Sequence, residues 1–189
     1  MIAALVLAAG SASRFGRTKQ VETVRGKPLV QHAIDAAVAA GVGDVVVVLG
    51  HDAERVRDAL RLPDAARTVV NPDHRDGLAS SLRAGLRALR PGSDAAVVLM
   101  GDQPGITDAH VGAIVDAFRE RPSPILRLKF RDGPGPALLA RETWAEAAGL
   151  EGDAGARVLM ERHPEWVVDV DVPGDAPVDV DEVTDLDGA

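Results

Sequence analysis

The sequence contains no cysteine and no tyrosine, and aromatic residues make up only 3% of it. Without cysteine there are no disulfides, thiolate metal sites, Fe–S clusters or thiol nucleophiles, and this absence fits a reducing compartment. A base-stacking platform for single-stranded nucleic acid needs aromatic side chains, so their scarcity argues against such a platform. We therefore expect a cytoplasmic protein that does not act on nucleic acid.

The sequence also lacks a basic run and a long apolar run. Its 29 acids outnumber its 21 Lys and Arg residues, for a formal net charge of −8, so neither a nucleic-acid backbone nor an anionic membrane is an expected partner. Eight of the acids and no Lys or Arg lie from Asp169 to Ala189, and most of this segment is predicted to be a solvated acidic tail. The apolar run Met1–Ala9 is too short to span a bilayer and is interpreted as a buried strand.

What the sequence does contain is a regular alternation of apolar runs and segments of helical period. Strands are predicted at 2–7, 44–49, 67–70, 95–100, 125–130, 137–140 and 166–172, and helices at 28–40, 53–60, 78–89, 107–119, 142–148 and 156–163. This alternation indicates βαβ units, and 189 residues suit one domain. We predict an α/β fold: a single domain, residues 1–189, with one doubly wound, mostly parallel sheet and a Rossmann-like nucleotide-binding half.

The loop after the first strand has the composition of a phosphate-binding loop. Ligands of such sheets bind beyond the carboxyl ends of the strands, and this loop runs from Leu7 to Lys19. Its small residues let backbone N–H groups approach a polyphosphate, and Arg14 and Lys19 add positive charge. It is not a Walker A loop, because five residues separate Gly10 from Gly16 and no Lys follows directly, and it is not GxGxxG. The alternative is a flexible Gly/Ser loop with two solvated cations.

A second polar loop follows the predicted strand that ends at Met100. Asp102 comes after this strand and Gly101, so its carboxylate is expected at the same edge of the sheet as the first loop. Magnesium takes hard oxygen ligands, commonly one or two carboxylates together with substrate phosphates. A turn-forming Asp before Gln-Pro is the alternative. Because both loops lie at one edge, we predict that Asp102 is a ligand of Mg²⁺.

The stretch from Leu7 to Lys19 reads LAAGSASRFGRTK. It resembles the signature loop LAAGxSxRxGxxK of the molybdenum cofactor nucleotidyltransferases, the MobA-like NTP transferase family, within the wider nucleotide-sugar pyrophosphorylase-like group, and departs from it at Ala12. Four further segments match in order. Residues 71–85 resemble the family's nucleoside-side segment, 101–104 (Gly-Asp-Gln-Pro) its metal-binding motif, 152–157 a motif of the cytidylyltransferase branch, and 179–186 the terminal DIDTPEDL stretch. The resemblance covers nearly the whole chain.

The resemblance implies a nucleotide site and a metal site. The implied nucleotide-binding residues are Leu7, Ala8, Ala9, Gly10, Ser11, Arg14, Lys19, Asn71, Gly77, Ser80 and Ser81. Arg14, Lys19 and Asp102 take the catalytic roles, and Asp102 and Asp181 are the implied Mg²⁺ ligands. Two alternatives stay open: Ser80 and Ser81 serve either the base or ribose or simply the start of a helix, and from charge alone Asp179 and Asp185 are interpreted as solvated tail.

The reaction implied is cytidylyl transfer from CTP to a molybdopterin-type acceptor, with in-line attack of an acceptor phosphate oxygen on the α-phosphorus and release of pyrophosphate. Cytidine is favoured over guanosine by Ala9, where guanylyltransferases usually show LAGG, and by residues 152–157. Residues 133–136 are expected to line the acceptor cleft, with a plain turn as the alternative. They lack the His that cytidylyltransferases often carry there. A molybdenum hydroxylase is the implied client.

Three other functions remain as alternatives. The first is a nucleotidyltransferase for a sugar phosphate or another phosphorylated acceptor. The second is an NAD(P)H-dependent oxidoreductase of the nicotine blue oxidoreductase type on the same scaffold, against which the missing GxGxxG argues. The third is a non-catalytic nucleotide-binding partner of a molybdenum hydroxylase, against which the presence of Lys19 and Asp102 argues.

Overall fold

The computed structural model describes residues 1–10, 15 and 17–187. Within these residues seven strands form one sheet with the order β5-β4-β1-β6-β8-β7-β9. Its strands are β1 (Ile2–Ala8), β4 (Val45–Leu49), β5 (Ala66–Val70), β6 (Ala95–Met100), β7 (Ile125–Lys129), β8 (Pro134–Ala140) and β9 (Val167–Asp171). Every neighbouring pair is parallel except the two pairs that include β8, which runs antiparallel to β6 and β7. The predicted mostly parallel α/β sheet is confirmed.

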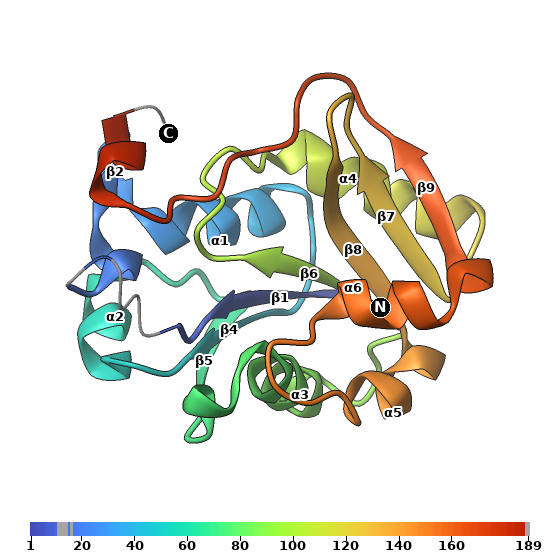
Figure 1. Ribbon diagram of the computed structural model, residues 1–189, viewed down its shortest axis with the longest axis horizontal. Helices are drawn as coiled ribbons and strands as arrows, with labels where there is room; N and C mark the ends of the chain where they lie inside the picture. The colour runs from blue at the N-terminus through green and yellow to red at the C-terminus, as the bar shows by residue number, and fades with distance from the viewer. Residues whose placement is uncertain (11–14, 16, 188–189) are drawn as a thin grey trace.

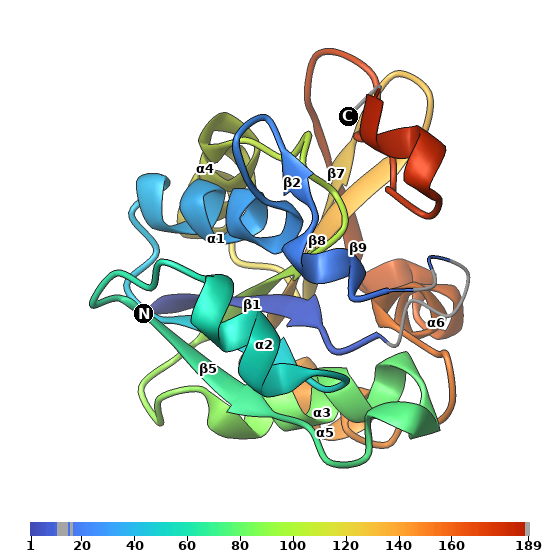
Figure 2. The ribbon, with the colours of Figure 1, turned by 90° about the vertical axis from the view of Figure 1, so that its left-hand side faces the viewer.

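Helices cover both faces of the sheet, which gives three layers. They are α1 (Leu29–Ala39), α2 (Ala53–Ala59), α3 (Leu78–Ala88), α4 (Asp108–Glu120), α5 (Trp144–Ala147) and α6 (Ala156–Arg162). Figures 1 and 2 show α1 and α4 on one face and α3, α5 and α6 on the other. The strand–helix pattern in the sequence therefore corresponds closely to the elements that form.

The central strands are buried on both faces. Along β1, Ala4 and Val6 belong to the apolar cluster under α1 and α4, whereas Leu5 and Leu7 belong to the cluster under α3. Successive side chains of a strand point to opposite faces, so a strand between two helical layers needs apolar residues at every position. This requirement explains the unbroken apolar runs in the sequence.

A short hairpin between β1 and α1 was not predicted. It consists of β2 (Thr23–Val24) and β3 (Lys27–Pro28). Its turn residues Arg25 and Gly26 both have positive φ, 47° and 82°, as a two-residue type I′ turn requires. Strands of two residues are too short to give a periodic signal, and Pro28 ends the hairpin instead of lying in the first turn of the following helix.

The acidic segment after β9 returns along the molecule to the β1 side of the sheet, where η5 (Val183–Asp187) lies near β2 (Figure 1). The N–H of Val180 donates to the carbonyl of Asp102 at 2.9 Å, and the Val180 side chain is buried against Phe15 and Leu29. Most acids of this segment are exposed, as expected for a solvated acidic tail, but the segment as a whole is docked on the core. The side chains of Asp179 and Asp181 are exposed, but the backbone between them is anchored to the core.

One buried carboxylate stabilises the amino end of the sheet. Asp44, which is fully buried before β4, forms ion pairs with Arg67 and Arg90 and accepts the backbone N–H of Arg90 at 3.1 Å. We expect Asp44→Ala to lower the free energy of unfolding by about 2–3 kcal/mol, because both guanidinium groups lose their acceptor. Urea denaturation measures this. The control is Asp58→Ala on the exposed side of α2, expected within about 0.5 kcal/mol of wild type; equal losses in both variants would contradict the interpretation.

Candidate active site

Two adjoining clefts open beside the carboxyl ends of β1 and β6. The first, of about 750 Å³, is lined by the end of β1, the segments that follow β4, β5 and β6, and the first turns of α3. The second, of about 850 Å³, lies between the sheet and α6. Leu7, Leu78, Met100 and Asp153 line both clefts. These four shared residues form the boundary between the two clefts.

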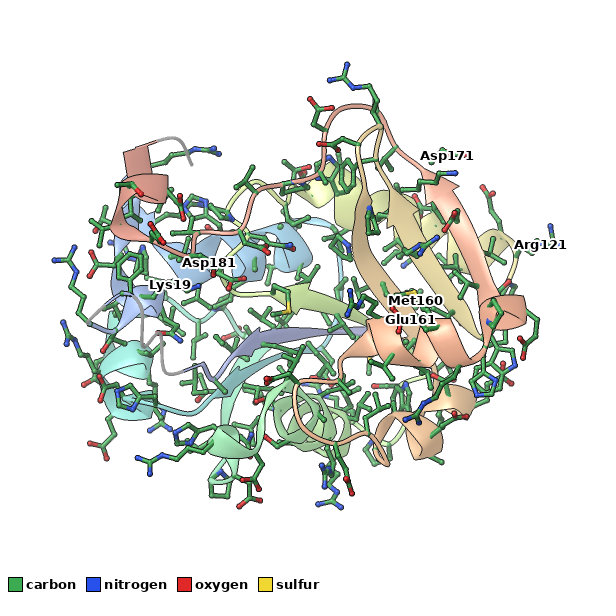
Figure 3. All side chains as sticks on the ribbon, viewed as in Figure 1. Lys19, Arg121, Met160, Glu161, Asp171 and Asp181 are labelled. Atoms are coloured by element: carbon green, nitrogen blue, oxygen red, sulfur yellow. The ribbon has the colours of Figure 1, made fainter. Side chains whose placement is uncertain are left out.

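Three charged side chains meet at the first cleft. Lys19 Nζ lies 3.0 Å from Asp102 Oδ2 and 3.4 Å from Asp181 Oδ1. The three residues come from distant parts of the chain, and Figure 3 shows the labelled Lys19 and Asp181 next to each other beside the end of β1. The fold thus brings together one predicted catalytic cation and both predicted metal carboxylates.

The second carboxylate oxygen of Asp102, Oδ1, is buried and has no hydrogen-bond partner within the described part of the chain. An unsatisfied buried acceptor costs about 1–3 kcal/mol, so a ligand that coordinates it would relieve that cost. Two carboxylates are hard oxygen donors suited to Mg²⁺ or Mn²⁺. No group of three His, Cys, Asp or Glu side chains in residues 1–10, 15 and 17–187 forms a metal site by itself. The donors therefore fit a divalent cation whose other ligands are phosphates or water.

Buried side chains fix the backbone around this cluster. Gln20 Nε2 donates to the carbonyls of Ala8 at 3.3 Å and Gly10 at 2.7 Å, which holds the end of β1 against η1 (Lys19–Val21). Ser11 and Arg14, predicted to bind the nucleotide, lie outside the described residues, so their roles stay predictions.

The predicted nucleotide residues divide into two groups. Those that line the first cleft are Leu7, Ala8, Ala9, Gly10, Lys19, Gly77 and Ser81. Asn71 and Ser80 are absent from its lining and are buried. The Asn71 amide donates to Ser80 Oγ at 2.8 Å and to Ser81 Oγ at 3.1 Å. The structure thus places Ser80 in a hydrogen-bond network at the start of α3, and it places Ser81 where a nucleotide can reach it.

Gly77 allows two backbone segments to approach each other closely. Its φ is +90°, and an added Cβ would lie 2.3 Å from the carbonyl carbon and oxygen of Gly152. The same carbonyl accepts the N–H of Ala79 at 3.0 Å. Residues 152–155 are therefore held against the first turn of α3, and this contact places Asp153 at the junction of the two clefts.

Several lining residues were not assigned a role from the sequence. His51, His74 and Arg75 line the first cleft, with the two imidazole centroids 6.4 Å apart. A Cβ at Gly50 would lie 2.6 Å from the Cβ of His74, so Gly50 makes room for that ring. His51 follows β4 and His74 follows β5, so the rule that ligands bind at the carboxyl ends of strands would have found both.

The second cleft has an apolar floor and a charged outer end. Leu82, Val98, Ala137, Met160 and Val167 are among its apolar lining residues, and Figure 3 shows Met160 and Glu161 on α6 above the sheet. At the outer end Arg127 Nε donates to Asp169 Oδ1 at 2.8 Å. Pro134, Gly135 and Pro136 line this cleft, and that this cleft binds the acceptor stays a prediction.

The far corner of the second cleft contains a stacked pair. The His163 and Trp166 rings lie 3.7 Å apart and nearly parallel, and Pro164 between them lines the cleft. Trp166 is partly buried and packs against the core. His163 Nε2 lies 2.7 Å from Glu146 Oε1. The hydrogen bond to Glu146 raises the pKa of His163 above its ordinary value of 6.5, and Glu165 adds to the effect.

Comparison with known proteins identifies the family and supports the fold. Residues 4–167 match the model of the MobA-like NTP transferase domain. The chain belongs to this family. It is 34% identical over 179 residues to nicotine blue oxidoreductase from Paenarthrobacter nicotinovorans, an alignment that covers 89% of this chain and 85% of that protein.

Two proteins of known structure are also similar to this MobA-like domain. Rv0371c from Mycobacterium tuberculosis H37Rv superposes with a TM-score of 0.88 at 34% identity, covering 99% of this chain and 96% of that one. The same protein has been solved in complex with manganese, TM-score 0.84. A nucleotidyl transferase from Methanothermobacter thermautotrophicus (Mth528) gives a TM-score of 0.82 at 26% identity, covering 98% and 94% of the two chains.

Family membership supports a nucleotidyltransferase-type enzyme. The matched range contains Lys19 and Asp102 but ends before Asp181, so the second carboxylate lies in a segment beyond the family match. No helix in the described part of this MobA-like chain is long and apolar enough to cross a membrane.

The contact at Gly77 gives a stability prediction. We expect Gly77→Ala to lower the free energy of unfolding by about 2 kcal/mol, because alanine is strained at this φ and its methyl group meets the Gly152 carbonyl. The matched control is Gly112→Ala in α4, where an added Cβ meets nothing within 4 Å. Alanine there favours the helix and should stabilise the protein by about 0.5–1 kcal/mol. Shifts of the same sign in both variants would refute the interpretation.

The raised pKa of His163 gives a pH prediction. The folded state binds the His163 proton more tightly than the unfolded state does, and this stabilises the fold. The stabilisation is fully present at pH values below the pKa of His163 in the unfolded chain, and it is lost as the pH rises through the pKa of His163 in the folded protein. We expect His163→Gln to lower Tm more at about pH 6 than at about pH 8.5. Differential scanning fluorimetry of both proteins at the two pH values measures this, and a constant difference in Tm would count against the ion pair with Glu146.

Proposed function

We propose that this chain is a single-domain nucleotidyltransferase that uses CTP and Mg²⁺ and transfers the cytidylyl group to a molybdopterin-type phosphorylated acceptor. The observation that carries this proposal is the cluster of Lys19, Asp102 and Asp181 in a cleft that adjoins a second, largely apolar cleft. The first cleft takes the nucleotide and the second takes the acceptor.

The residues of the cluster supply positive charge and cation binding. Asp102 and Asp181 would hold a divalent cation, which would neutralise charge on the triphosphate. Lys19 supplies a further positive charge next to the phosphates. An acceptor phosphate oxygen attacks the α-phosphorus. The new bond joins that oxygen to the α-phosphorus, and the bond from the α-phosphorus to the oxygen bridging to the β-phosphate breaks, so pyrophosphate leaves. The attacking oxygen is already ionised near neutral pH, so no general base is required.

The dimensions of the second cleft favour an elongated acceptor. Its lining residues come from β1, β6, β8, β7 and β9, which are neighbours in that order. Four strand spacings of about 4.8 Å give a floor about 19 Å across. A hexose phosphate covered with hydroxyls would leave much of this apolar floor unfilled, whereas a fused-ring acceptor covers it. We therefore favour the molybdopterin-type acceptor over a sugar phosphate.

The choice of base depends on the wall of the first cleft. Ala9 is only 4% exposed and packs in the apolar cluster under α3, so its methyl group limits the room beside the end of β1. A single methyl group discriminates by only about 1–3 kcal/mol, and Ser81 is the polar group available nearby. We propose that these two residues together favour CTP over GTP.

A second candidate function rests on one observation, the 34% identity to nicotine blue oxidoreductase over 89% of the chain. Under this alternative the two clefts hold NAD(P)H and an oxidised aromatic substrate. The sequence lacks the GxGxxG loop of dinucleotide-binding folds, which favours nucleotidyl transfer.

The two functions give different products. We expect pyrophosphate release from CTP in the presence of Mg²⁺ and molybdopterin, less from GTP, and none after EDTA treatment. Each NTP is assayed with and without molybdopterin and with a hexose phosphate, and NAD(P)H oxidation is followed by absorbance with a quinonoid dye. Dye-dependent oxidation of NAD(P)H without pyrophosphate release from any NTP would overturn the proposal.

A substitution at Asp102 tests the site itself. Asp102→Asn removes a charged ligand but keeps the side-chain shape, so we expect kcat to fall by about 100-fold or more while Tm changes little. Asp116→Asn, on the exposed face of α4 where Asp116 pairs with Arg119, is the matched control and should keep wild-type kcat. Unchanged turnover and unchanged magnesium dependence in Asp102→Asn would show that Asp102 only shapes a turn.

A further inference from the structure

The position of Lys19 suggests a role beyond phosphate binding. Its ammonium lies between two carboxylates, 3.0 Å from Asp102 Oδ2 and 3.4 Å from Asp181 Oδ1. The Lys19 side chain is only 12% exposed. Because Asp102 Oδ1 is also buried, both groups are withdrawn from solvent in this arrangement. Lys19 therefore neutralises the same two carboxylate groups that are the candidates for binding a metal, and it leaves Asp102 Oδ1 without a partner.

The Lys19 ammonium and a divalent cation compete for the carboxylates of Asp102 and Asp181. Mg²⁺ binds carboxylate oxygens at about 2.0–2.1 Å, so an ion on this pair of carboxylates would lie within a few ångström of Lys19 Nζ. Two cations at such a distance repel each other strongly unless anions lie between them. The phosphates of a nucleotide are such anions, and they give Lys19 a new partner.

We propose that Lys19 is an exchangeable counter-cation of the Asp102–Asp181 pair, so that the metal binds tightly only together with the nucleotide. Lys19 leaves the carboxylates when the phosphates arrive, and the metal takes its place. Metal and nucleotide are then positively coupled, and by linkage each raises the affinity for the other by the same factor. This inference rests on the proposed function, since it takes the first cleft to bind a nucleotide.

This role differs from that of a lysine that only binds phosphate. Removal of a phosphate-binding lysine weakens nucleotide binding and leaves the affinity of the free protein for metal unchanged. Removal of a counter-cation also leaves two carboxylates without their cation, and this raises their affinity for a divalent ion. The affinity for metal in the absence of nucleotide therefore distinguishes the two roles.

The experiment titrates Mn²⁺ into the full chain without nucleotide and measures binding by calorimetry and by the EPR signal of free Mn²⁺. We expect Lys19→Met, which keeps the apolar stem but removes the charge, to bind Mn²⁺ about tenfold more tightly than wild type. The matched control is Arg17→Met. It removes a cation from the same loop, but Arg17 pairs with Glu22 at 2.7 Å, so Mn²⁺ affinity should stay at the wild-type value. Adding Asp102→Asn to Lys19→Met should abolish the gain.

A second titration measures the coupling with α,β-methylene-CTP, which is not cleaved at the α–β bond. Wild-type affinity for Mn²⁺ should rise about tenfold with this analogue, and the rise should be much smaller in Lys19→Met. If Lys19→Met is less stable than wild type, thermal unfolding gives the same information, because Mn²⁺ should raise its Tm more than that of wild type.

Equal Mn²⁺ affinities of wild type and Lys19→Met without nucleotide would overturn the counter-cation role. If pyrophosphate release from CTP persisted in that case, the proposed function would still stand. In contrast, a gain in Mn²⁺ affinity in Lys19→Met without pyrophosphate release from any NTP in wild type would support the counter-cation and refute the nucleotidyltransferase. The two hypotheses can therefore fail separately.

Discussion

The parallel pairing of β1 with β6 is the constraint on which the site depends. Leu7 pairs with Met100, and the N–H of Gly101 continues the ladder by donating to the Leu7 carbonyl at 2.9 Å. The chain segments that carry Lys19 and Asp102 therefore leave the sheet at the same height on adjacent strands. The strands are about 4.8 Å apart, so a lysine side chain easily reaches from one loop to the other.

The same pairing limits what can occupy the ends of the strands. A Cβ at Gly101 would lie 3.0 Å from the Cβ of Ala8. Glycine at this position therefore lets the loop after β6 pass close to the end of β1. On the other side of the clefts, the close contact of Gly77 with Gly152 places α3 and the segment before α6 together. This backbone contact thus lies at the boundary between the two clefts, where Asp153 lines both of them.

The sequence predicts the layers well because burial on both faces of the sheet forces a recognisable composition. Val45–Leu49, for example, is apolar at every position and fully buried. The sequence also predicts that Lys19 and Asp102 are neighbours, because the loops that carry them follow central strands. The sequence does not predict whether Asn71 and Ser80 face the cleft or a buried hydrogen-bond network. A polar residue type alone does not determine the direction in which its side chain points. The docking of the C-terminal segment is also hidden, since it depends on Val180, one apolar residue among acids.

That docking has a consequence for biosynthesis. Lys19 and Asp181 are 162 positions apart, and the strands of the sheet are all translated before Asp181. The pairing of Lys19 with Asp181 can therefore form only after the C-terminal segment has been synthesised and has docked, so the candidate site is completed later than the central strands of the sheet. The neighbouring Val178 is 76% exposed, so a protease that cuts there in the mature protein would leave the sheet folded and disconnect the same carboxylate.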